Sequence, residues 1–242
     1  MTSNISIEEL SQCGSPYKIY QDKSAFCFGI DAVLLADYAK GMRGNRICDL
    51  CTGNGIIPIL LAGKISAQEI HGLELQKDIA DLARESVRLN NLEDRIKIFD
   101  GNLKKATEIF EKNTYDAVTV NPPYMKPNSE TRETPKSIAR QEIHCNLEDV
   151  IKASAGLLKS NGKFFMIHRP NRLGEIFILL EKYNLGARRI RLVQPKENEK
   201  PTMFLLEAEK CLHPELIVEP VLKIYSEPGI YSAETKEIYG RE

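Results

Sequence analysis

The tetrapeptide Asn121-Pro122-Pro123-Tyr124 combines hydrogen-bond acceptors with a rigid backbone. It follows YDAVTV (115–120), which has the apolar, β-branched composition of a buried strand. Two prolines cannot continue a sheet, because neither nitrogen carries a hydrogen. The Asn121 side-chain oxygen and the Pro122 carbonyl can each accept one N–H of a planar amino group, on which Tyr124 can stack. The motif therefore predicts a site for an exocyclic amine or an amide nitrogen; a purely structural turn is the alternative.

Glycines and an acid follow a second apolar stretch, in DLCTGNG (49–55). Gly53 and Gly55 let the backbone approach a ligand closely and open a helix towards it. Read as a dinucleotide-binding fingerprint, the third glycine position is Pro58, so the phosphate motif is not matched. The preceding Asp49 favours a cofactor that carries a cationic amine. A tight strand-to-helix turn without a ligand is the alternative.

Acidic residues lie near the ends of two further stretches. Glu74 lies in GLEL (72–75), where a carboxylate can accept hydrogen bonds from ribose hydroxyls. Asp100-Gly101-Asn102 follow RIKIFD (95–100) and can address the edge of an adenine. Each acid alone is typical of a solvated or capping side chain, but three in register indicate a cofactor site.

These residues require a sheet that brings strand ends together. Apolar stretches predict seven strands, at 45–50, 69–75, 95–100, 115–120, 163–168, 187–195 and 202–210. Helical periodicity predicts helices at 55–64, 76–91, near 102–112, at 146–162 and near 171–184. The alternation predicts an α/β fold with a doubly wound, mostly parallel seven-stranded sheet, whose last two strands form an antiparallel edge hairpin. Ligands bind such sheets beyond the carboxyl ends of the strands.

Composition narrows the class of protein. The 242 residues are 42% hydrophobic and 28% charged, without an 18-residue apolar run or a signal-peptide pattern, so we expect a cytoplasmic globular protein. Cys48 and Cys51 form a C-x-x-C without a second pair, which favours reduced structural cysteines over a redox or zinc site, and no metal is expected. Residues 121–200 hold 15 Lys and Arg against 9 Asp and Glu, which permits a basic face on a chain of net charge −1.

Taken in order, DLCTGNG, GLEL, DGN and NPPY resemble the class I S-adenosylmethionine-dependent methyltransferases, specifically the branch that methylates amino groups. The resemblance implies S-adenosyl-L-methionine as cofactor and a Rossmann-like single domain over 1–242. Its catalytic core spans 29–210, with extensions at 1–28 and 211–242. An amine conjugated to a ring is a poor nucleophile, so two acceptors that hold its hydrogens would concentrate electron density on the nitrogen, and in-line positioning completes the reaction.

The flanks are similar to a narrower family. FCFGIDAVLLADYAKGM (26–42), SIARQEIHCNLEDV (137–150), HRP (168–170) and NEKPTMFLLEA (198–208) resemble the bacterial tRNA1(Val) adenine-37 N6-methyltransferases. The family implies methyl transfer to N6 of an unpaired adenine in the anticodon loop, where extruding the base costs little. Ile30 departs from the Thr or Ser that other members often carry. Methylation of rRNA guanine N2 or of protein glutamine, and a non-catalytic RNA-binding protein with the same fold, remain alternatives.

The resemblance assigns residues by matching position. The catalytic motif is Asn121, Pro122, Pro123 and Tyr124. The cofactor residues are Phe28, Gly29, Asp31, Asp49, Thr52, Gly53, Asn54, Gly55, Glu74, Leu75, Asp100, Gly101, Asn102 and Asn121, although Asp31 could instead cap a helix. Candidate tRNA contacts are Lys126, Arg132, Lys136, Arg140, His168, Arg169 and Arg172, together with the run Arg188, Arg189 and Arg191, which could also be the solvated face of a strand. The polar loop 126–140 is expected to order on tRNA.

Overall fold

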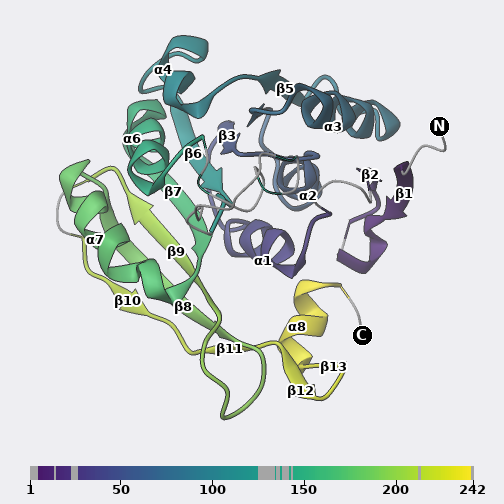
Figure 1. Ribbon diagram of the computed structural model, residues 1–242, viewed down its shortest axis with the longest axis vertical. Helices are drawn as coiled ribbons and strands as arrows, with labels where there is room; N and C mark the ends of the chain where they lie inside the picture. The colour runs from purple at the N-terminus through teal and green to yellow at the C-terminus, as the bar shows by residue number, and fades with distance from the viewer. Residues whose placement is uncertain are drawn as a thin grey trace.

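The computed structural model describes residues 5–13, 15–22, 27–124, 134, 137, 142, 144–211 and 214–240. A nine-stranded sheet forms its centre, in the order β10-β8-β9-β7-β6-β3-β4-β5, with β11 paired to β8 (Figure 1). The main strands are β3 (Arg46–Leu50), β4 (Glu69–Glu74), β5 (Ile96–Asp100), β6 (Tyr115–Val120), β7 (Leu158–His168), β8 (Gly186–Gln194) and β9 (Met203–Glu209). Strands β3 to β7 pair in parallel, whereas β9 lies antiparallel between β7 and β8. This confirms the predicted mostly parallel α/β sheet and the antiparallel pairing of its last two predicted strands, whereas β10 and β11 extend the sheet beyond the seven strands predicted.

Helices cover both faces of the sheet (Figure 1). On one face lie α1 (Ile30–Tyr38), α2 (Ile56–Lys64) and α3 (Lys77–Leu89), and on the other lie α4 (Ala106–Ile109), α6 (Leu147–Leu157) and α7 (Leu173–Lys182). Successive side chains of β7 alternate between two cores: Phe165 and Ile167 join the first, and Phe164 and Met166 join the second. A strand buried on both faces explains why these sequences are apolar without interruption.

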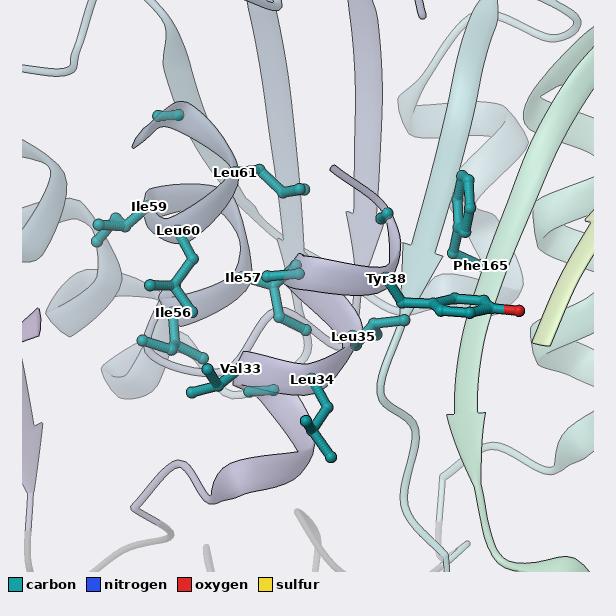
Figure 2. Close-up of a cluster of buried hydrophobic side chains, with 14 of the residues drawn as sticks. Val33, Leu34, Leu35, Tyr38, Ile56, Ile57, Ile59, Leu60, Leu61 and Phe165 are labelled. Carbon is teal, nitrogen blue, oxygen red and sulfur yellow. The ribbon is translucent and has the colours of Figure 1, made fainter. Parts of the chain in front are cut away.

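Figure 2 shows the part of the first core to which α1 and α2 contribute. Leu35, Ile59 and Leu60 are fully buried there. At the end of α1 the Tyr38 ring meets Phe165 edge to face, with ring centroids 6.5 Å apart. Both helices are apolar on nearly every side, so burial rather than amphipathic patterning fixes them beneath the strand ends that form the site.

The structure differs from the prediction at two helices. The helix expected over 146–162 ends at Leu157, because Leu158 is extended and pairs with Tyr115 as the first residue of β7. Gly162, expected to end that helix, lies inside the strand, where a Cβ would approach the Lys159 carbonyl to 2.8 Å. The helix expected near 102–112 is a 3-10 turn, η2 (Leu103–Lys105), followed by the single turn of α4.

Segments at both ends of the chain add to this core. The hairpin of β1 (Ile5–Glu9) and β2 (Lys18–Asp22) is joined by η1 (Leu10–Cys13), and the Tyr20 N–H donates to Ser86 of α3 at 3.0 Å. At the other end β10 (Ile217–Val218) and β11 (Leu222–Lys223) extend β8, followed by β12 (Tyr225–Glu227), β13 (Ile230–Tyr231) and α8 (Ala233–Ile238). Within the described ranges, no helix has the length and apolarity needed to span a bilayer.

Candidate functional site

A cavity opens at the carboxyl ends of β3, β4, β5 and β6, where the sequence predicts the site. It encloses about 1020 Å³ of empty space, part of it open to solvent. Ten predicted residues line it: Phe28, Thr52, Gly53, Asn54, Glu74, Leu75, Gly101, Asn102, Asn121 and Pro123.

The glycine loop between β3 and α2 forms one wall. Gly53 (φ 56°) and Gly55 (φ 85°) both have left-handed backbones, which glycine adopts without steric cost. A Cβ on Gly53 would meet nothing within 4 Å, whereas one on Gly55 would lie 3.3 Å from the Ala83 Cβ. Gly53 therefore leaves room on the cavity side, and Gly55 allows α2 to pack closely on α3.

Glu74 links this loop to the end of β4. Its carboxylate accepts the Gly53 N–H at 3.0 Å and the Gln76 N–H at 2.9 Å. The side chain is almost completely buried, and burial raises its pKa above the usual value in spite of these bonds. Two backbone donors thus fix the carboxylate at the cavity wall, in the position expected to bind ribose hydroxyls.

Asp49 lies behind the wall and does not line the cavity. Its two oxygens accept the hydroxyl hydrogens of Thr52 and Thr119, each at 2.6 Å. The residue is fully buried, and desolvation raises the pKa of its carboxyl to about 7. A nearby cation would favour the ionised form, which is the electrostatic contribution that the site offers to a positively charged ligand.

The third strand end contributes through its glycine and asparagine. The Asp100 carboxylate is exposed and is held by Arg84 at 2.6 Å, which lowers the pKa of Asp100. Gly101 and Asn102 line the cavity, and the Asn102 side-chain oxygen caps η2 by accepting the Lys104 N–H at 3.0 Å. In this structure Asp100 thus bonds to α3 rather than facing the cavity.

The motif Asn121–Tyr124, called the acceptor turn below, directly follows β6 and forms another part of the cavity wall. Asn121 and Pro123 line it, while Tyr124 lies behind Asn121. The Tyr124 hydroxyl hydrogen-bonds to Asn121 Oδ1 and donates to Asp31 Oδ2 at 3.0 Å. Gly29 is the N-cap residue of α1, so Asp31 is not the cap but lies in the first helical turn.

Two neighbours hold the Tyr124 ring. His168 packs against it edge to face with centroids 5.2 Å apart, and the Arg169 guanidinium lies 5.1 Å from the ring centroid. His168 is fully buried, accepts the Arg169 N–H at Nδ1, and has a pKa that burial lowers to about 4. The imidazole is therefore neutral near pH 7. These contacts fix the position of the Tyr124 ring, which is half-buried.

The cysteine pair read from sequence is divided. Cys48 is buried in β3, whereas Cys51 lines the cavity and its thiol hydrogen-bonds to Cys145. Among the described residues, no group of His, Cys, Asp and Glu side chains is arranged to hold a metal ion.

The candidate tRNA contacts have different environments. Lys126, Arg132, Lys136 and Arg140 fall outside the described residues. Arg172 is buried and is bound by Glu142 at 2.7 Å and Glu175 at 2.8 Å. Each cation of the run on β8 is paired with a carboxylate: Arg188 with Glu209, Arg189 with Glu207 and Glu219, and Arg191 with Glu234. Arg169 is exposed and has no carboxylate partner in the described part of the chain.

Seven predicted residues do not themselves line the cavity: Gly29, Asp31, Asp49, Gly55, Asp100, Pro122 and Tyr124. Ten other residues line it that were not predicted: Ala32, Cys51, Ile56, Ile57, Leu73, Gln76, Ile79, Leu103, His144 and Cys145. Most of these are apolar side chains whose sequence pattern is that of the core. His144 and Cys145 lie in SIARQEIHCNLEDV (137–150), the stretch that resembles the tRNA methyltransferases, and this resemblance is the signal that could have identified them.

Comparison with known proteins agrees with this geometry. The model of the methyltransferase small domain family matches residues 19–183, and the chain belongs to that family. Curated relatives named tRNA1(Val) (adenine(37)-N6)-methyltransferase occur in Phocaeicola vulgatus, 26% identical, and Bacteroides thetaiotaomicron, 28% identical. Both alignments cover 92% of this chain and 94% of the relative. The resemblance read from the sequence is confirmed, and the protein is a methyltransferase.

Solved structures support the fold. A predicted O-methyltransferase from Agrobacterium tumefaciens superposes with a TM-score of 0.70 at 22% identity, over 87% of this chain and 95% of that one. The geranyl diphosphate C-methyltransferase of Streptomyces coelicolor, solved with S-adenosyl-L-homocysteine, gives a TM-score of 0.56 at 14% identity, over 75% and 80%. Methyltransferases with different substrates thus share this sheet.

Proposed function

We propose that the protein transfers a methyl group from S-adenosyl-L-methionine to N6 of adenine-37 in the anticodon loop of a valine tRNA. One observation carries the proposal. Asn121 of the acceptor turn and Glu74, the carboxylate predicted to bind ribose hydroxyls, both line the same cavity. The names of the curated relatives support the choice of base and RNA.

The residues would divide the work as follows. Glu74, Gly53 and Asn102 line the part of the cavity suited to a nucleoside cofactor, which supplies an electrophilic methyl group when bound. Asn121 Oδ1 and the Pro122 carbonyl would accept the two hydrogens of the adenine amine, so that its lone pair is directed at that methyl group. The exposed Arg169, beside Tyr124, would contact an RNA phosphate.

A methylation assay tests the proposal. Purified protein, S-adenosyl-L-methionine and a valine tRNA transcript should yield N6-methyladenosine at position 37, detected by nucleoside mass spectrometry. Asn121→Ala should abolish turnover while calorimetry still detects cofactor binding. The control Asn45→Ala removes an exposed asparagine at the opposite end of β3 and should leave turnover unchanged.

Parallel arms contain an rRNA fragment with guanine N2 exposed and a glutamine peptide. Methylation of one of these in place of the tRNA would refute the proposed substrate. Absence of both cofactor binding in calorimetry and methylation in every arm would favour a non-catalytic RNA-binding protein that retains the fold. Equal loss of cofactor binding and turnover in Asn121→Ala would refute the role given to Asn121.

A further inference from the structure

The Tyr124 hydroxyl contacts two acceptor oxygens but has only one hydrogen to donate. The phenol has a single O–H, yet it meets Asp31 Oδ2 at 3.0 Å and Asn121 Oδ1 on its other side. Both of those atoms are acceptors, so the hydroxyl can donate to only one of them.

The proton belongs on the Asp31 side. Asp31 Oδ1 accepts the Ala32 N–H at 3.0 Å, and the carboxylate lies in the first turn of α1, where the helix dipole favours negative charge. An ionised carboxylate is also a stronger acceptor than an amide oxygen. The Tyr124 oxygen then faces Asn121 with lone pairs, which require a donor.

We propose that Asp31 and Tyr124 are positioning residues that hold the Asn121 amide with Nδ2 against the Tyr124 oxygen and thereby leave Oδ1 for the amine of the substrate. Rotation of the amide by 180° exchanges its nitrogen and oxygen while the shape of the side chain is kept. Each contact in the chain from Asn121 to Tyr124 to Asp31 then has one donor and one acceptor.

The packing of Tyr124 suits this role. His168 and Arg169 contact the ring, and the hydroxyl is the group through which Tyr124 hydrogen-bonds to Asn121 and Asp31. Neither Tyr124 nor Asp31 lines the cavity, so removing either polar group should not disturb cofactor contacts directly. The importance of the chain for catalysis rests on the proposed function; the orientation of the amide does not.

Neutron diffraction from perdeuterated crystals tests the orientation without any substrate. The expected map shows the Tyr124 deuteron directed at Asp31 Oδ2 and an Asn121 Nδ2 deuteron directed at the Tyr124 oxygen. A Tyr124 deuteron directed at Asn121 Oδ1 would overturn the inference, whatever the enzyme methylates.

Kinetics test the consequence. Tyr124→Phe and Asp31→Asn should each lower kcat roughly five- to tenfold, the effect of one ordered hydrogen bond, with cofactor affinity unchanged within about twofold. The double variant should be no slower than Tyr124→Phe, because Asp31 acts only through the hydroxyl. Tyr183→Phe removes a phenol that donates to Glu148 at 2.8 Å, and because neither residue lines the cavity it serves as the matched control.

The two proposals fail in different ways. Wild-type protein that does not methylate the tRNA refutes the proposed function, and the neutron map still decides the orientation. An active wild type whose two variants lower kcat multiplicatively, to roughly 25- to 100-fold together, refutes the coupling through Tyr124 while the function stands.

Discussion

Replacing Asp49 with asparagine should change how stability depends on pH. The carboxyl is fully buried, and its pKa rises from an ordinary 3.8 to about 7 because burial penalises the charged form. Below pH 3.8 both folded and unfolded states are protonated. Between pH 3.8 and 7 the unfolded chain loses its proton while the folded protein retains it, so stability falls as pH rises through this window. At 1.36 kcal/mol per pH unit the full effect is about 4 kcal/mol.

Asparagine removes this dependence but loses part of a hydrogen-bond network. The amide nitrogen can donate to Thr52 or Thr119, and the displaced hydroxyl hydrogen then lacks its acceptor, at a cost of about 1 kcal/mol. We expect the free energy of unfolding of Asp49→Asn, relative to wild type, to rise by roughly 2 to 3 kcal/mol between pH 5 and pH 8.

Urea denaturation at several pH values measures the difference, in which the titration of other groups cancels. Asp94→Asn, which alters an exposed aspartate, is the control and should change stability by less than about 0.5 kcal/mol at each pH. A difference between Asp49→Asn and wild type that stays constant from pH 5 to pH 8 would refute the assignment of a raised pKa to Asp49.

Three further predictions concern groups around the cavity. The buried His168 has a pKa near 4, so the free energy of unfolding of the wild type should fall by up to about 3 kcal/mol as pH falls from 6.5 to 4. In urea titrations His168→Leu should reduce this dependence on pH, and an unchanged dependence would contradict the prediction. Arg172→Met leaves Glu142 buried without its cation and should lower the free energy of unfolding, measured by chemical denaturation, by about 3–5 kcal/mol. Lys182→Met breaks an exposed ion pair and should lower it by less than about 1 kcal/mol, so equal losses would count against the prediction. In Glu74→Gln the single side-chain oxygen can accept only one of the two backbone N–H groups, so calorimetry should show S-adenosyl-L-methionine binding about tenfold weaker. Unaltered affinity would exclude a role for the carboxylate in binding the cofactor.

The sequence predicts well which residues lie at the strand ends of this protein. It predicts poorly which side chains far apart in the chain contact one another. Gly53, Glu74 and Asn121 could be assigned to one site because parallel strands end at the same edge of a sheet. Their roles in binding the cofactor and amine stay predictions. The end of the helix before β7 was predicted wrongly, because Gly162 is typical of a helix C-terminus and its close contact with the neighbouring strand is invisible in sequence.

Partners distant in the chain account for the other differences. Arg172 looks like a free cation in sequence, and only the fold brings Glu142 to it, 30 residues away. In the same way only the fold brings Asp31 to the Tyr124 hydroxyl, 93 residues away, while the stacking role of the Tyr124 ring stays a prediction. Apolar cavity residues such as Ile79 have the periodicity of the core, so no local pattern distinguishes them.

The chain leaves the cavity at Pro123 and returns to it at His144 and Cys145, which also line it. The return is anchored, because Asn146 and Asp149 form a reciprocal capping box at the start of α6. At the other side of the interval, the Tyr124 hydroxyl is bound to Asp31 and Asn121. Each flank of the interval thus has hydrogen bonds of its own, so a change in length or sequence between residues 125 and 141 should leave the cavity residues on either side in place.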